Sequence, residues 1–387
     1  MQRHPPATSS QWDIFCSVID NYGDIGVTWR LASQLAAQYD IAVRLWVDDL
    51  QAFHHIRPEV DPTAATQCLR GVEIRRWTIP LPPIEPGDVV IEALACNLPD
   101  AFIQAMAKKS PTPVWINLEY LCAENWVEGV HGLPSPHPRL PLTQYFFMPG
   151  YTTGSGGLTR EKALYGEREA FQNDARAQSD FWAGLGIPDK DALRISLFSY
   201  ECRSLPDLLE VCSRGDRPID LVLPRGRATA QITAWFAHPQ AGDLLSRGRL
   251  RVFLLPMLAQ DDYDRLLWAC DLNFVRGEDS FVRAQFAARP MIWQAYRQEE
   301  NAHLDKLAAF LDLYCARLSP ETANLLRAVW QAWNREEALG ALWPDWIAAL
   351  PALSEHAHAW ARRLAEQDDL AANLVKFIDN LLECRAF

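Results

Sequence analysis

Residues 12–30, WDIFCSVIDNYGDIGVTWR, form the stretch that decides the fold. The part over 14–19 is an apolar run rich in β-branched and aromatic residues, which is typical of a buried strand. The run stops at the turn-forming cluster 20–24, and apolar residues then recur at helical spacing up to Gln38. The pattern predicts a strand, a loop and a helix. Open α/β sheets bind ligands at such a loop, beyond the carboxyl end of the strand.

The predicted loop has the composition of a ligand site. Asp20 and Asp24 stand four residues apart, and Gly23 and Gly26 let the backbone come close to a ligand. Two carboxylates at this place could take part in a reaction, but aspartates before a helix also cap it. For an isolated turn, capping is the favoured interpretation.

The composition is that of a globular chain with two domains. Of its 387 residues, 49% are hydrophobic and 22% are charged, and this length exceeds one ordinary core. The net charge of −12 argues against non-specific nucleic-acid binding and favours a small molecule or a protein as partner. No apolar stretch reaches the length of a membrane span. Residues 1–11 indicate a flexible tail and not a signal peptide, and nine cysteines without a C-x-x-C pair indicate reduced thiols of a cytoplasmic protein.

Strand and helix patterns alternate in two series, which predicts an α/β protein with two mostly parallel sheets covered by helices. The strand candidates of the first series are 14–19, 43–47, 72–77, 88–91, 114–118 and 145–148. Those of the second series are 194–198, 219–223, 250–255, 272–275 and 291–293, and the pattern is helical from 302 onward. We expect a tail over 1–11, one Rossmann-like domain over 12–185, a second over 186–365, and a C-terminal helix over 366–387 that could pack back across the domains.

A second informative stretch is DLNFVRGEDSFVR at residues 271–283. Its pattern again predicts a strand, a polar loop and a helix. Capping of the first turn by Ser280 or Asp279 would leave other backbone N–H groups for a phosphate, and Arg276 or Arg283 could add a cation. Glu278 could accept hydrogen bonds from ribose hydroxyls. A well-capped helix with surface charges explains this stretch equally well.

Other strand ends and loops add candidates of a different kind. Phe198 and Tyr200 follow a predicted strand and could stack on a nucleobase. Residues 225–227, Arg-Gly-Arg, follow another strand and could approach a diphosphate or an acidic partner. The glycine-rich stretch 151–158 matches no phosphate-binding motif, and it could be a flexible loop over a ligand or a plain loop. Residues 262–264 match the metal-binding D-x-D pattern of some glycosyltransferases, but they lie within a helical pattern. We expect them on a helix surface, and we expect no metal.

Four strings resemble the elongation factor P maturation arginine rhamnosyltransferases: 20–27 (DNYGDIGV), 117–121 (NLEYL), 264–271 (DRLLWACD) and 276–285 (RGEDSFVRAQ). The likeness runs along nearly the whole chain. It implies a GT-B architecture of two facing Rossmann-like domains, with a helical C-terminus. It also implies that the first domain is the acceptor side with the aspartate loop, and that the second binds the TDP-sugar. The implied reaction is inverting, metal-independent transfer of L-rhamnose from TDP-β-L-rhamnose to one arginine of translation elongation factor P, which helps ribosomes stalled on polyproline.

The resemblance also assigns site residues. Its essential acidic residues fall at Asp20, Asp24 and Glu278. Its nucleotide-sugar site draws on several loops and comprises Asn21, Tyr22, Gly23, Phe198, Tyr200, Gln260, Arg276, Gly277, Glu278, Asp279 and Ser280. It implies no resident cofactor, no nucleic acid and no membrane partner.

Residue chemistry fits this reaction. A protonated guanidinium has no lone pair for attack, and a carboxylate can pair with it and take a proton. We assign that role to Asp20, with Asp24 orienting either Asp20 or the guanidinium. Two alternatives stay open: a GT-B transferase with another sugar donor, and a non-catalytic, nucleotide-dependent binder of elongation factor P. The paired aspartates favour catalysis, because a pure binder of an anionic donor would not place two carboxylates beside it.

Overall fold

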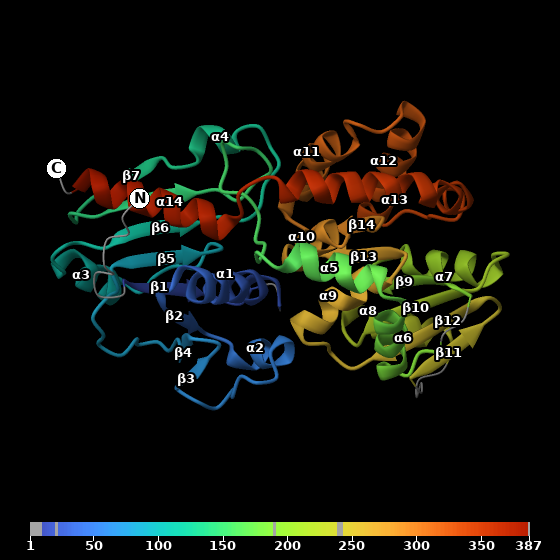
Figure 1. The fold of residues 1–387 in the computed structure, drawn as a ribbon, viewed down its shortest axis with the longest axis horizontal. Coiled ribbons are helices and arrows are strands. Elements are labelled where there is room, and N and C mark those ends of the chain that lie inside the picture. Colours follow the sequence, from blue (N-terminus) through green and yellow to red (C-terminus); the bar gives the residue numbers. More distant parts are fainter. Residues whose placement is uncertain (1–9, 20–21, 189–190, 238–242, 386–387) are drawn as a thin grey trace. The chain divides into compact units, whose positions relative to one another are not determined.

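A computed structural model of the protein describes residues 10–19, 22–188, 191–237 and 243–385 (Figure 1). The chain forms two compact units. Unit 1 comprises residues up to Glu161 together with those from Gln367 onward, and unit 2 comprises Lys162–Glu366. Within the described ranges, no helix is both long and apolar enough to cross a membrane.

Unit 1 is built on an eight-stranded sheet with the order β3-β4-β2-β1-β5-β6-β8-β7. The strands are β1 (Gln11–Cys16), β2 (Ala42–Val47), β3 (Thr66–Leu69), β4 (Val72–Arg76), β5 (Val89–Ala93), β6 (Val114–Leu118), β7 (Pro134–Pro136) and β8 (Thr143–Phe147). The helices are α1 (Gly23–Tyr39), α2 (Leu50–Ile56), α3 (Asp100–Lys108), α4 (Val127–Val130) and α14 (Leu370–Arg385). The central strand β1 pairs in parallel with β2 and β5, and α1 packs on β1 and β2 (Figure 1).

Unit 2 is built on a six-stranded sheet with the order β11-β12-β10-β9-β13-β14. The strands are β9 (Leu193–Leu197), β10 (Ile219–Pro224), β11 (Leu244–Arg247), β12 (Leu250–Leu255), β13 (Leu272–Arg276) and β14 (Met291–Gln294). The helices are α5 (Leu164–Asn173), α6 (Ala175–Gly184), α7 (Leu205–Arg214), α8 (Arg227–Trp235), α9 (Gln260–Ala269), α10 (Asp279–Phe286), η1 (Glu299–Asn301), α11 (Ala302–Cys315), α12 (Pro320–Asn334) and α13 (Trp343–Ala365). The predicted α/β class with two mostly parallel sheets is therefore confirmed.

Each of the two sheets contains an ion pair between a buried aspartate and an arginine of the neighbouring strand, and this pair specifies strand register. Asp13 on β1 is fully buried, and its carboxylate accepts two hydrogen bonds from the guanidinium of Arg44 on β2, at 2.7 and 2.6 Å. Asp220 on β10 is equally buried and accepts two hydrogen bonds, both 2.7 Å, from Arg251 on β12. Both pairs join residues that stand opposite each other on neighbouring parallel strands. A one-residue slip would leave the buried carboxylate without its cation, so each pair specifies the register.

The structure differs from the sequence-based expectations at three places. The first strand ends at Cys16 and not at residue 19, because side-chain carboxylates, and no neighbouring strand, bind the backbone N–H groups of Val18 and Ile19. The first boundary between units follows residue 161 and not residue 185, because Trp182 packs in a core cluster with Phe253 of unit 2. The edge strands β3, β7 and β11 lack a strand pattern in the sequence, and each pairs antiparallel with a neighbour.

The C-terminal helix α14 belongs to unit 1 and packs on α1 and β6. The glycine-rich stretch 151–158 lies against the start of this helix. The side chain of Asn373 donates a hydrogen bond of 3.2 Å to the carbonyl of Gly156, and the backbone N–H of Leu370 donates one of 2.9 Å to the carbonyl of Leu158. This stretch is thus packed within unit 1, which favours the plain loop over the flexible loop, the two alternatives that the sequence left open.

Candidate functional site

The loop between β1 and α1 is held by two carboxylates. The backbone N–H of Val18 donates a 2.9 Å hydrogen bond to Asp48, whose second carboxylate oxygen accepts from the hydroxyl of Ser17 at 2.5 Å. The backbone N–H of Ile19 donates to Asp24 Oδ2 at 2.8 Å. The chain on the amino side of residue 20 is therefore fixed. The predicted site residues Asp20 and Asn21 lie outside the described residues.

Asp24 is an interior residue of the first turn of α1. Its side chain is only 2% exposed, and its Oδ1 accepts a 3.2 Å hydrogen bond from the hydroxyl of Tyr120. A carboxylate here also favours the helix, because it lies near the positive end of the helix dipole. Asp24 thus joins the loop, the helix and the segment after β6. Tyr120 itself was not predicted as a site residue, although it lies in a string that carries the family resemblance.

Two other predicted residues flank Asp24. Gly23 is the first residue of α1, and Tyr22 precedes it as the N-cap, without a side-chain cap hydrogen bond. The ring of Tyr22 meets His55 of α2 edge to face, with 5.9 Å between ring centroids. The structure therefore brings Tyr22, Gly23 and Asp24 together at the carboxyl end of β1.

In unit 2, the guanidinium of Arg276 lies between two aromatic rings. Its central carbon is 4.5 Å from the ring centroid of Phe198 and 4.4 Å from that of Tyr200. Arg276 is 5% exposed and ends β13, directly before the loop that opens α10. Two cation–π contacts stabilise this position of the guanidinium, and each contributes about 0.5–2 kcal/mol of stabilisation. The aromatic pair that we predicted to stack on a nucleobase therefore also fixes a cation.

The loop after β13 is shaped by backbone contacts. Gly277 adopts φ +62°, a conformation that side chains disfavour, and its carbonyl accepts a 2.8 Å hydrogen bond from the indole of Trp293. Glu278 is next, as the N-cap of α10 without a side-chain cap hydrogen bond, and its carbonyl accepts from Val282 at 3.0 Å.

The expected capping of α10 is wrong for Ser280. Its buried hydroxyl accepts from the backbone N–H of Arg276 at 3.2 Å and donates to the carbonyl of the same residue, so it closes the loop onto the end of β13. The carboxylate of Asp279 accepts a 3.1 Å hydrogen bond from the amide of Gln260, the first residue of α9. Gln260 and Arg276 to Ser280 are thus brought together, and with them Phe198 and Tyr200.

The D-x-D stretch is wrongly expected on a helix surface. Tyr263 is partly buried against the core cluster that contains Trp182 and Phe253, and burial raises the pKa of its phenol. Asp264 is 4% exposed and accepts two hydrogen bonds, of 3.0 and 2.7 Å, from the guanidinium of Arg283. Only Asp262 stays at the surface, with Arg265 as ion-pair partner at 3.2 Å. This triplet ties α9 to α10.

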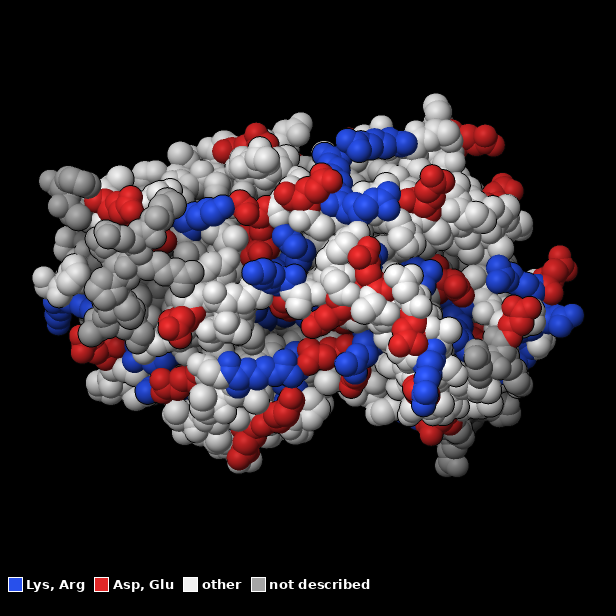
Figure 2. Space-filling model, in the orientation of Figure 1, with Lys and Arg blue, Asp and Glu red and all other residues white. Residues whose placement is uncertain are grey.

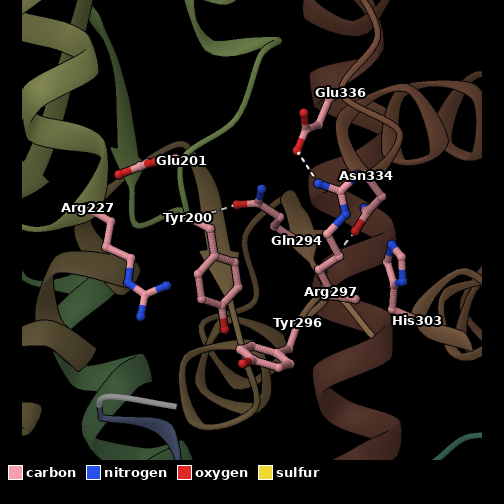
Figure 3. A pocket seen from close by; sticks show the side chains of 10 residues that line it. Tyr200, Glu201, Arg227, Gln294, Tyr296, Arg297, His303, Asn334 and Glu336 are labelled. Atoms are coloured by element: carbon pink, nitrogen blue, oxygen red, sulfur yellow. Dashed lines mark hydrogen bonds and ion pairs between the residues drawn. The ribbon is translucent and has the colours of Figure 1, made fainter. Parts of the chain in front are cut away.

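A pocket of about 380 Å³ adjoins Tyr200 at the carboxyl ends of the strands of unit 2 (Figure 3). Arg227, Gln294, Tyr296, Arg297 and His303 contribute to its lining. Burial, and next the charge of Arg297, lower the pKa of His303, so its imidazole favours the neutral form. Sequence reasoning missed the pocket at Gln294 and Tyr296, because a short strand ends there without a recognisable motif.

Charged side chains of both signs intermingle on the face drawn in Figure 2. Among the residues that the structure describes, no group of three or more His, Cys, Asp or Glu side chains could hold a metal ion.

Two units of Rossmann type, each with an anchored polar loop at the carboxyl end of a strand, define the class of GT-B glycosyltransferases. The model for the family "Elongation-Factor P (EF-P) rhamnosyltransferase EarP" matches residues 12–379. The chain belongs to this family, and its enzyme class is protein-arginine rhamnosyltransferase.

Protein-arginine rhamnosyltransferases of other bacteria align with nearly the whole chain. The protein-arginine rhamnosyltransferase of Pseudomonas aeruginosa is 52% identical over 371 residues, which cover 95% of this chain and 98% of the relative. That of Pseudomonas putida is 50% identical over 374 residues, covering 96% and 99%. A solved structure concerned with EarP-mediated arginine glycosylation of translation elongation factor EF-P has a TM-score of 0.69 and 38% identity, covering 96% of this chain and 99% of the other.

Proposed function

We propose that this chain transfers L-rhamnose from TDP-β-L-rhamnose to one arginine side chain of EF-P, with inversion at the anomeric carbon and without a metal ion. The observation that carries the proposal is the guanidinium of Arg276, fixed between Phe198 and Tyr200 next to the N-terminus of α10. A rigid cation beside helix N–H groups suits a diphosphate leaving group. Residues 260 and 277–280 surround this place and complete the proposed donor site.

The proposed step is a single displacement. A guanidinium nitrogen of the acceptor forms a bond to the anomeric carbon while the bond from that carbon to the diphosphate oxygen breaks, through an oxocarbenium-like state. Asp20 pairs with the guanidinium and takes the proton that the attacking nitrogen loses. The electron pair of the broken bond leaves with TDP, and Arg276 stabilises its charge. One displacement from the opposite face inverts the anomeric centre.

Asp24 and Glu278 have supporting parts in this proposal. Asp24 binds the backbone N–H of Ile19, directly before Asp20, so it would set the direction in which Asp20 points. Glu278 stands at the start of α10 and would accept hydrogen bonds from donor hydroxyls. Tyr22 and Gly23 lie next to the aspartates and would complete the donor contacts from unit 1, together with Asn21.

The proposed acceptor is the folded EF-P protein and not a short peptide. A chain with a net charge of −12 attracts basic peptides of any sequence, so charge alone does not select one arginine. Recognition of the acceptor's fold would therefore supply the specificity. A translation factor as acceptor also implies that the reaction takes place in the cytoplasm.

A donor screen tests the proposal. Titration calorimetry with TDP-rhamnose, other TDP-sugars and UDP-sugars should give the tightest binding for TDP-rhamnose. NMR of the modified EF-P should show a sugar whose anomeric configuration is opposite to that of the donor. Retained configuration would refute single displacement. A preference for another sugar nucleotide would support the alternative of a GT-B transferase with a different donor, and binding without any product would support a non-catalytic binder.

A further inference from the structure

Asp48 lies directly after β2, at the carboxyl end of the sheet of unit 1. β1 and β2 run parallel and pair in register up to Cys16 and Val47. Asp48 therefore follows β2 where Ser17 follows β1. Its Oδ2 accepts a 2.5 Å hydrogen bond from the hydroxyl of Ser17, and its Oδ1 accepts one of 2.9 Å from the backbone N–H of Val18. One carboxylate thus binds two consecutive residues of the loop after β1.

Hydrogen bonds to carboxylates, more than packing, support the loop at this point. β1 ends at Cys16, and the side chain of Ile19 is 60% exposed, so it buries little apolar surface. Asp24 of α1 binds the next backbone N–H, that of Ile19, at 2.8 Å. Asp48 and Asp24 therefore hold the loop from two different elements, immediately before Asp20 in the sequence.

The neighbouring Asp49 has a different role. Its side chain accepts a 2.9 Å hydrogen bond from the backbone N–H of Ala52 and caps α2. The helix therefore does not depend on Asp48 for its cap. Asp48 is also exposed, and exposed side chains contribute little to the stability of a fold. Its two hydrogen bonds thus act on the loop more than on the fold.

We propose that Asp48 is a positioning residue of the transfer reaction, which holds the loop after β1 so that Asp20 meets the acceptor guanidinium in a reactive geometry. The inference rests on the proposed function, because it takes Asp20 as the base. Asp48 acts through the backbone of Val18, two residues before Asp20, and touches neither substrate in this proposal. A misplacement near 1 Å reduces turnover roughly 100-fold. Because Asp24 would still bind Ile19, loss of the Asp48 carboxylate should lower kcat by about 10- to 30-fold.

The test compares two adjacent aspartates. Asp48→Ala should lower kcat for EF-P modification about 10- to 30-fold, while the KM for EF-P and the Kd for TDP change less than about twofold, because the acceptor's fold and unit 2 supply the binding. The matched control Asp49→Ala loses the cap of α2. It should therefore lower the midpoint of urea denaturation at least as much as Asp48→Ala does, and it should keep the wild-type kcat.

Two further variants separate the geometry of Asp48 from its charge. In Asp48→Asn the amide oxygen can accept from the N–H of Val18, and the amide nitrogen can donate to the hydroxyl of Ser17. This variant should therefore keep kcat within about threefold of the wild-type value. Ser17→Ala removes the 2.5 Å hydrogen bond and should lower kcat about three- to fivefold. It should lower kcat no further in the Asp48→Ala background, because the contact is already lost there.

Wild-type kcat in a folded Asp48→Ala enzyme would overturn the inference, and so would an equal loss of kcat in Asp49→Ala. A loss in Asp48→Asn as large as that in Asp48→Ala would overturn it too, since the charge and not the geometry would then matter. If Asp48→Ala does not fold, Ser17→Ala decides, because unchanged kcat in this variant contradicts the positioning. A wild-type enzyme that makes no rhamnosylated EF-P, or an Asp20→Asn enzyme with full turnover, would instead refute the proposed function.

Discussion

The substitution Asp24→Ala should separate catalysis from nucleotide binding. Asp24 is 2% exposed and accepts hydrogen bonds from Ile19 N at 2.8 Å and from the Tyr120 hydroxyl at 3.2 Å. Hydrogen bonds to a charged group contribute about 1.5–3 kcal/mol each, so we expect the free energy of unfolding to fall by about 3–5 kcal/mol. Release of the loop would displace Asp20, and a misplacement near 1 Å reduces turnover roughly 100-fold.

Three measurements make this prediction specific: urea denaturation, the rate of EF-P modification, and calorimetry with TDP. The affinity for TDP should change less than about twofold, because the main proposed nucleotide contacts lie in unit 2 and a twofold change is only about 0.4 kcal/mol. The control Tyr120→Phe removes the 3.2 Å hydrogen bond and keeps the carboxylate, so it should cost about 1 kcal/mol of stability and leave most of the turnover. Wild-type turnover in a folded Asp24→Ala enzyme would refute this reasoning, and so would a large loss of TDP binding.

Three further predictions concern unit 2. Arg276→Met should weaken TDP binding about 30- to 100-fold by calorimetry, because a fixed cation at the proposed diphosphate position is lost. Asp264→Ala should lower the free energy of unfolding by about 3–5 kcal/mol, since it removes the carboxylate that pairs with the buried guanidinium of Arg283, whereas Asp262→Ala at a surface pair should cost less than about 1 kcal/mol. Burial and the charge of Arg297 lower the pKa of His303 in the folded protein. As the pH falls, the unfolded state therefore binds a proton on this imidazole before the folded state does. Stability should therefore fall as the pH drops below the ordinary value of 6.5, and His303→Gln should reduce that fall in urea denaturation at pH 7.5 and 5.5.

For each of these three predictions, one result would contradict it. Unchanged TDP affinity of Arg276→Met would remove this arginine from the donor site. Similar costs for the two aspartate variants would mean that the Asp264 ion pair contributes no more than a surface pair. A His303→Gln enzyme with the full wild-type loss of stability in acid would assign that loss to other groups.

The alternation of strands and helices could be predicted because it is a local property of the sequence. Apolar runs of five or six residues mark the central strands, while turn residues and helical periodicity mark the loops and helices after them, as in residues 12–30. The edge strands could not be predicted in this way. Pro134–Pro136 and Leu244–Arg247 are short and largely exposed, and they are strands only because a neighbouring strand binds them.

The candidate site was predictable from rare strings, but its internal contacts were not. The strings make Asp24 and Arg276 candidates, whereas the rings that hold Arg276 come from the end of β9, some 80 residues earlier in the sequence. Helical periodicity also does not tell which face of α9 is buried, so Tyr263 and Asp264 were expected at the surface. Gln294 could not be singled out at all, since a glutamine at the end of a short strand has many possible roles.

Intact-mass spectrometry of EF-P, after incubation with this chain and TDP-β-L-rhamnose, tests the central claim most directly. We expect a gain of one deoxyhexosyl group with the wild-type enzyme. The gain should be absent when the target arginine of EF-P is replaced by lysine, and also with an Asp20→Asn enzyme that still binds TDP. No gain from a wild-type enzyme that binds TDP-rhamnose, or a gain that persists on the lysine variant of EF-P, would contradict arginine rhamnosylation by this chain.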